Sequence, residues 1–263
     1  MRAILFFTLL LILPLNMMAQ AMETGFLNRT LNHDGEERLY QVYVPADYTA
    51  DKNWPVILFL HGAGEEGKDG LMQTAVGLGH AVRKYVDRFP AIIVFPQSRR
   101  PGGWISTETP LALKALAQTH DEFSTDKDRV YLTGLSNGGF GSWSIAYNNT
   151  DQFAAVMVIC GYLSARDIAR EIPADRKFPM AVPGAEQDTY ETLAEKLKDK
   201  PVWIYHGDAD SVVSVRGARG IYAALKARGA PAHYTELPGI DHNSWDAAYS
   251  SEEAVEWLLS QKR

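Results

Sequence analysis

Short apolar runs alternate along this chain with segments in which apolar residues recur at helical spacing. Three runs are continuously apolar, at Pro55–Leu60, Ala91–Phe95 and Phe153–Cys160, which is typical of strands buried on both faces of a parallel sheet. Further strands are predicted at Arg38–Val44, Arg129–Thr133, Pro201–His206 and Ala232–Leu237. Helices are predicted at Leu71–Arg88, Thr109–Phe123, Gly139–Tyr147, Val215–Arg228 and Ser251–Gln261. This alternation predicts an α/β fold with a mostly parallel central sheet and helices on both faces.

The segment 161–200 interrupts the alternation. It carries Pro173, Pro179 and Pro183 among mixed charges, with one helix predicted at Thr189–Lys198. Because the segment is too short for a full second domain, we expect at most a small lid or substrate loop there. The chain has 263 residues, of which 46% are hydrophobic, and residues 22–263 are predicted to form one globular domain.

The first residues have the pattern of a secretory signal peptide. A positive start is followed by an almost wholly apolar stretch, Ala3–Leu15, and then by the small-residue motif Ala19-Gln20-Ala21. The alternative is an uncleaved membrane anchor, but Pro14 and Asn16 limit the apolar run, and a spanning helix needs about 20 apolar residues. We therefore expect residues 1–21 to be removed after Ala21, leaving no stable membrane anchor and a secreted or periplasmic protein.

Charge and cysteine content exclude several classes of partner. The net charge is −6 and no basic run occurs, so nucleic acid is not an expected partner. Cys160 is the single cysteine, which leaves no internal disulfide in an exported protein. Neither an H-E-x-x-H motif nor paired cysteine ligands occur, and we expect neither a metal site nor a cofactor.

The motif Gly134-Leu135-Ser136-Asn137-Gly138 points to nucleophilic catalysis. It reads G-x-S-x-G and lies between a predicted strand and a predicted helix, which is the context of a nucleophile elbow. The strained turn of such an elbow exposes the serine, and small neighbours avoid clashes with the adjacent strand and helix. Ser136 is therefore the candidate nucleophile. The backbone N–H of Asn137, the next residue, is a candidate oxyanion donor.

Chain order selects the base and the acid, because in this class of enzyme they follow the serine as acid and then histidine. Of the seven histidines, His242 lies after the last predicted strand, in a loop that can reach the serine. We predict Asp210 as the acid, with Asp208 as the alternative, since both follow the strand ending at His206. Asp241, beside His242, is expected to be solvated.

The loop after the first buried strand, His61-Gly62-Ala63-Gly64-Glu65-Glu66-Gly67, is the expected source of the second oxyanion donor. The N–H of Ala63 is preferred, with that of Gly64 second. The loop also fits a G-x-G-x-x-G dinucleotide motif, but Glu65 and Glu66 would face a pyrophosphate. In a later loop, Trp104 is either a wall for the substrate or a partly buried loop aromatic.

Together these motifs resemble secreted α/β-hydrolases of the predicted peptidase or phospholipase/carboxylesterase group. That group is related to dienelactone hydrolases, polyhydroxybutyrate depolymerases, and feruloyl and acetylxylan esterases. The segments that carry the resemblance are Phe59–Glu65, Gly134–Gly139, Ile159–Gly161, His206–Asp210 and His242–Trp245. The resemblance implies an exported serine esterase with residues 22–263 as its catalytic domain, acting on small or polysaccharide-linked esters. A serine peptidase with the same triad, or a non-catalytic hydrolase-like binding protein, is the alternative.

Overall fold

A computed structural model describes residues 23–99, 103–104, 108–169, 181–185 and 188–263. Its centre is an eight-stranded sheet in the order β1-β2-β4-β3-β5-β6-β7-β8. The strands are β1 (Gly25–His33), β2 (Glu36–Val44), β3 (Trp54–Leu60), β4 (Ile92–Pro96), β5 (Thr125–Leu135), β6 (Ala155–Ile159), β7 (Val202–Gly207) and β8 (Ala232–Leu237). Strands β3 to β8 are parallel, whereas β1 and β2 pair antiparallel at one edge. The predicted α/β fold with a mostly parallel sheet is confirmed.

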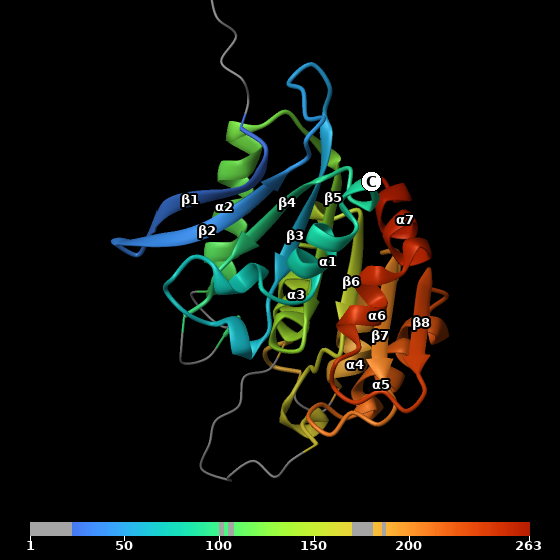
Figure 1. The fold of residues 1–263 in the computed structure, drawn as a ribbon. Helices are drawn as coiled ribbons and strands as arrows, with labels where there is room; N and C mark the ends of the chain where they lie inside the picture. The colour runs from blue at the N-terminus through green and yellow to red at the C-terminus, as the bar shows by residue number, and fades with distance from the viewer. Residues whose placement is uncertain (1–22, 100–102, 105–107, 170–180, 186–187) are drawn as a thin grey trace, which may run out of the picture.

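Helices cover both faces of this sheet (Figure 1). They are α1 (Leu78–Lys84), α2 (Glu108–Glu122), α3 (Asn137–Asn148), α4 (Thr189–Lys196), α5 (Val215–Ala227), α6 (Trp245–Ser250) and α7 (Glu252–Ser260). Side chains alternate along each buried strand, so Val56 and Leu58 pack with α2 to α5, while Ile57 and Phe59 pack with α1, α6 and α7. The two apolar clusters hold the parallel strands in place, and with them the loops at their carboxyl ends.

The predicted helix Leu71–Arg88 is wrong in extent. The segment forms two 3-10 turns, Met72–Thr74 and Val86–Arg88, around the short helix α1. Gly77 adopts a φ of 63°, outside the helical range, and ends the first turn before α1 begins. The glycines of this segment are the sequence signal for the shorter helix, because each lowers helix stability by about 1 kcal/mol.

One strand and one α-helix were not predicted at all. Strand β1 pairs only with β2 and is mostly half-exposed, so its apolar pattern is weak. The turn between them does carry a recognisable signature, because Asp34 and Gly35 have φ values of 52° and 80°, as the Asp-Gly pair of a tight hairpin requires. Helix α6 has only six residues and follows the His242 loop. In the part of the chain that the structure describes, no helix combines the length and apolar content of a membrane span.

Candidate active site

Ser136 lies in a strained turn between β5 and α3. Its φ and ψ are 53° and −114°, a conformation that non-glycine residues rarely adopt. Backbone hydrogen bonds hold the turn, because Ser136 N donates to Ile159 O over 2.9 Å and Phe140 N donates to Ser136 O over 3.0 Å. The serine is thereby fixed at the carboxyl edge of the sheet, where the elbow motif predicted it.

The glycines of the motif are required by close main-chain approaches. A Cβ on Gly138 would lie 1.9 Å from Leu60 O, at the end of β3, and a Cβ on Gly134 would lie 2.4 Å from Gly138 O. These distances are far shorter than a non-bonded contact, so only glycine fits. As a result the elbow packs directly against the start of the loop that follows β3.

Three side chains predicted from separate parts of the sequence meet at this edge. The Oγ atom of Ser136 lies 2.9 Å from His242 Nε2, and His242 Nδ1 lies 2.8 Å from Asp210 Oδ2. Since a carboxylate only accepts, Nδ1–H donates to Asp210, and Nε2 is left to accept the serine proton. The Trp245 ring packs edge-on against His242 with centroids 5.5 Å apart.

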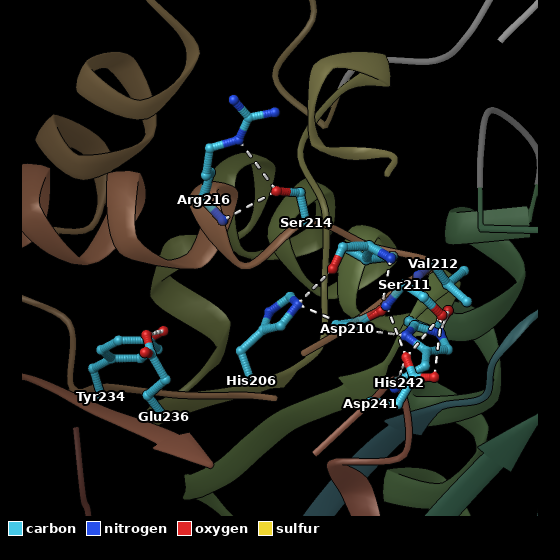
Figure 2. A network of polar contacts seen from close by, with 12 residues as sticks. His206, Asp210, Ser211, Val212, Ser214, Arg216, Tyr234, Glu236, Asp241 and His242 are labelled. Atoms are coloured by element: carbon cyan, nitrogen blue, oxygen red, sulfur yellow. Dashed lines mark hydrogen bonds and ion pairs between the residues drawn. The ribbon is translucent and has the colours of Figure 1, made fainter. Parts of the chain in front are cut away.

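Asp210 is held as an anion inside the protein. Its Oδ1 atom accepts the N–H groups of Val212 and Val213, each over 2.8 Å. Burial by itself raises the pKa of Asp210, but hydrogen bonds from His206, His242 and the Val213 amide outweigh it and hold that pKa well below its ordinary value. The carboxylate is therefore charged at neutral pH. Figure 2 shows the contacts that fix its orientation.

The other two acidic residues of these loops have different contacts. Asp208 accepts the N–H of Gly239 over 2.6 Å, as a turn residue does. Asp241 is exposed and accepts from the Ser211 N–H over 2.7 Å and from the main-chain N–H of His242 over 2.8 Å. The ring of His242 thus contacts Asp210 rather than either neighbour.

Of the positions predicted for oxyanion donors, Asn137 follows the serine directly, and Ala63 lies in the loop whose start packs against the elbow. Asn137 begins α3, and Ala63 begins a 3-10 turn, Ala63–Glu65, directly after β3. The Asn137 side chain is held from both sides, because Tyr162 donates to its Oδ1 over 3.0 Å and its Nδ2 donates to Glu66 over 3.0 Å. Sequence reasoning did not single out Tyr162, although it follows a buried strand at the same sheet edge.

Buried contacts of His61 and Trp104 hold the loop that follows β3. His61 is fully buried, its Nδ1 lies 2.6 Å from Gly62 O, and its Nε2 accepts the Ser98 N–H over 3.0 Å. The Trp104 indole is 0% exposed and donates to His61 O over 2.8 Å. Trp104 is therefore more deeply buried than the predicted loop aromatic, and its ring does not line a substrate wall in this structure, because no part of it reaches the surface.

The buried His61 makes stability depend on pH. Burial lowers the pKa of His61 from 6.5 to about 4. Between these pH values the histidine is protonated in the unfolded chain and unprotonated in the folded chain. The contribution of His61 to the free energy of unfolding is fully present above pH 6.5. It is lost as the pH drops toward 4, by roughly 3 kcal/mol. We expect urea unfolding to show a weaker pH dependence in His61→Gln across that window. Equal pH dependence in the two proteins would contradict it.

Among the described residues, no group of three His, Cys, Asp or Glu side chains is placed to hold a metal ion. Cys160 is buried behind the elbow, and burial strongly raises the pKa of its thiol. The serine and histidine are thus the groups at this edge with nucleophilic and basic chemistry. A mostly parallel sheet with an elbow serine, a histidine loop and an acid loop at its carboxyl edge defines an α/β-hydrolase.

Comparison with known sequences assigns the family. A sequence model of the prolyl oligopeptidase family matches residues 101–261, more than half of the chain, and the chain belongs to this family. Its 30% identity to a probable feruloyl esterase C of Aspergillus flavus covers 49% of this chain and 48% of that protein. An uncharacterized secreted protein of Arthroderma benhamiae is 27% identical over 72% of this chain and 21% of its own length.

A solved structure also resembles the chain closely. The crystal structure of a thermostable esterase superposes with a TM-score of 0.72 at 29% identity, covering 90% of this chain and 63% of that one. The resemblance to α/β-hydrolases of carboxylesterase type is thereby confirmed. The chain spans less than half the length of the two fungal relatives.

Proposed function

We propose that this protein is a serine hydrolase that cleaves carboxylic esters through an acyl-enzyme. The observation that carries the proposal is the unbroken line of contacts from Asp210 through His242 to Ser136, with distances of 2.8 and 2.9 Å. In that arrangement a weak serine nucleophile has a base beside it, and the base has a fixed anion behind it.

The reaction follows from these positions. His242 Nε2 takes the proton of Ser136 as Oγ attacks the ester carbonyl, and Asp210 stabilises the imidazolium that forms. The backbone N–H groups of Asn137 and Ala63 are proposed to receive the developing oxyanion, a contribution of about 3 kcal/mol per donor. The imidazolium then protonates the leaving alcohol as the acyl-enzyme forms. Water repeats the sequence, with His242 again as base, and releases the acid.

The substrate class proposed is a small ester or an ester group attached to a polysaccharide. Support comes from the name of the Aspergillus relative, a probable feruloyl esterase. A serine peptidase with the same triad is the second candidate, and the family to which the chain belongs favours it. A non-catalytic binding protein is a weaker candidate, because such a protein has no need of an aligned Ser136, His242 and Asp210.

Turnover of p-nitrophenyl acetate beside a set of peptide anilides separates the first two candidates. An esterase should cleave the ester well and the anilides poorly, and a panel of acetyl, butyryl, feruloyl and octanoyl esters then defines the acyl group. Preferential cleavage of the anilides would make the protein a peptidase. Failure to cleave any of these compounds, by folded protein, would favour the binding protein.

We further propose that the protein is exported, with residues 1–21 as the signal peptide. The support is the sequence pattern described above and the name of the Arthroderma relative, a secreted protein. Residues 1–22 lie outside the described part of the chain. Mass spectrometry of the protein recovered outside the cytoplasm should give Met22 as the first residue. Full-length chain in the membrane fraction would argue for an uncleaved anchor.

A further inference from the structure

A second histidine contacts the carboxylate of Asp210. His206 is the penultimate residue of β7 and is completely buried. Its Nε2 atom lies 3.0 Å from Val213 O and 3.2 Å from Asp210 Oδ2, the oxygen that His242 also contacts (Figure 2). Chain order excluded His206 as the base, and no motif in the sequence placed it behind the acid.

The neighbours of His206 determine which of its nitrogens carries the proton. Both atoms near Nε2 are acceptors, a carbonyl oxygen and a carboxylate oxygen, so Nε2 must be the donor. The other ring nitrogen, Nδ1, is buried and has no hydrogen-bond partner among the described residues. A proton on Nδ1 would be an unsatisfied buried donor, which is costly. The contacts of His206 therefore require a proton on Nε2 and offer no partner for one on Nδ1.

The donor from His206 completes the set of contacts around Asp210. Oδ1 accepts the two amides of Val212 and Val213, and Oδ2 accepts the two imidazoles. A carboxylate offers about four acceptor directions, and all of them are used. The carboxylate cannot rotate without breaking bonds on both oxygens, and Oδ2 shares its electron density between two donors.

We propose that His206 is a positioning residue of the triad, whose Nε2–H fixes Oδ2 of Asp210 toward His242 and limits how strongly Asp210 stabilises the imidazolium. This inference rests on the proposed function. Because His206 reaches the reacting atoms only through Asp210 and His242, it contributes alignment and electrostatic tuning rather than a proton to the reaction.

The other charged groups around His206 are engaged elsewhere. Glu236 lies opposite His206 in the register of β7 and β8, but it accepts from Arg219 over 2.6 and 2.8 Å and from Tyr234 over 2.5 Å. Close to the His206 end of β7, Asp208 and Asp241 are exposed, the thiol of Cys160 is buried, and Arg216 at the start of α5 donates to Ser214. Asp210 is the carboxylate that contacts the imidazole, so a change at His206 should act on Asp210.

Two nearly isosteric substitutions test the role. The amide of a glutamine side chain at this position can place an N–H near the site of Nε2, whereas a methionine of similar length cannot donate. We expect His206→Met to lower kcat by about 10- to 100-fold, the range of a hydrogen bond to a charged group, with little change in KM. We also expect the acid limb of the kcat/KM profile to move to higher pH, since an Asp210 freed of one donor stabilises the His242 imidazolium more. His206→Gln should have most of the wild-type kcat, and the acid limb of its kcat/KM profile should lie at the wild-type pH.

The matched control is His120→Gln, because His120 is half-buried, contacts Thr125 over 2.7 Å and makes no contact with the triad. It should leave kcat and the pH profile unchanged. If His206→Met is folded by circular dichroism yet keeps wild-type kcat and an unmoved acid limb, the proposal is overturned. A loss of activity that His206→Gln does not restore, with an unmoved limb, would also overturn it, because that pattern belongs to packing alone.

A measurement on the unmodified protein keeps the proposal testable if His206→Met does not fold. ¹⁵N spectra of histidine-labelled enzyme should show one histidine, absent from His206→Gln, with a protonated Nε2 and a bare Nδ1. A proton on Nδ1 of His206 would overturn the proposal. The triad itself is tested independently through Ser136. If Ser136→Ala is inactive but His206→Met keeps the wild-type kcat and pH profile, this inference is rejected and the proposed function is not.

Discussion

Ser136→Ala is expected to reduce kcat for a simple ester by about 10⁶-fold, to the level left by binding and backbone donors. The reason is the geometry, since the Oγ atom that the substitution removes is the atom 2.9 Å from His242 Nε2. No other side chain among the described residues is placed to replace it, because the thiol of Cys160 is buried and its pKa is strongly raised. Steady-state turnover of p-nitrophenyl acetate measures the loss.

Covalent labelling makes this prediction specific. A serine-directed organophosphonate should inactivate the wild-type enzyme, add its mass to the peptide that contains Ser136, and leave Ser136→Ala unmodified. Circular dichroism should show the same fold in both proteins, because Ser136 is not part of either apolar cluster. A chelator should leave the activity unchanged. Full activity in Ser136→Ala, or its loss on chelation, would refute a serine hydrolase.

Asp210→Asn is expected to lower kcat by about 10⁴-fold, whereas Asp208→Asn should have a small effect. The asparagine oxygen must stay with the Val212 and Val213 amides, which need an acceptor, so its NH₂ group would face His242. An imidazole facing that donor carries its proton on Nε2 and can no longer accept one from Ser136. The side chain would also meet the N–H of His206 as a second opposed donor.

Asp208 is a matched control for this change. It lies two residues away in the same loop, carries the same carboxyl group and accepts a main-chain N–H from Gly239, so its substitution tests the loop without touching the imidazole. The kcat values of both variants, measured on one ester, decide the assignment. Equal and mild effects from both would show that the acid was chosen wrongly.

The buried strands and the triad could be predicted because their information is local or ordered along the chain. Continuous apolar runs located β3, β4 and β6, since a strand covered on both faces has no polar side to show. Gly134 and Gly138 marked the elbow, because a Cβ on Gly138 would meet the main chain of β3 and a Cβ on Gly134 would meet the main chain of Gly138. The order of acid and histidine then indicated His242 and narrowed the acid to Asp208 and Asp210.

What the sequence did not predict depends on contacts between distant segments. Strand β1 lies at an edge and pairs with β2 alone among the described strands. The burial of Trp104 depends on its packing against the loop of His61, 43 positions earlier. His206 was excluded because it precedes the acid in the chain, and its contact with Asp210 arises only when the loop after β7 folds back over it. The pattern of apolar and polar residues does not indicate where a loop folds back onto an earlier segment.

The main-chain contact between Gly138 and Leu60 has a consequence for how the enzyme meets its substrate. A Cβ on Gly138 would lie only 1.9 Å from the carbonyl oxygen of Leu60, so the elbow and the end of β3 are tightly packed together. A fluctuation that displaces one must displace the other, so the spacing between the nucleophile and the amides of the neighbouring loop is set when the chain folds. For the proposed ester cleavage, such a preorganised site needs little reorganisation free energy as charge develops, so we expect rigidity here to contribute to the rate.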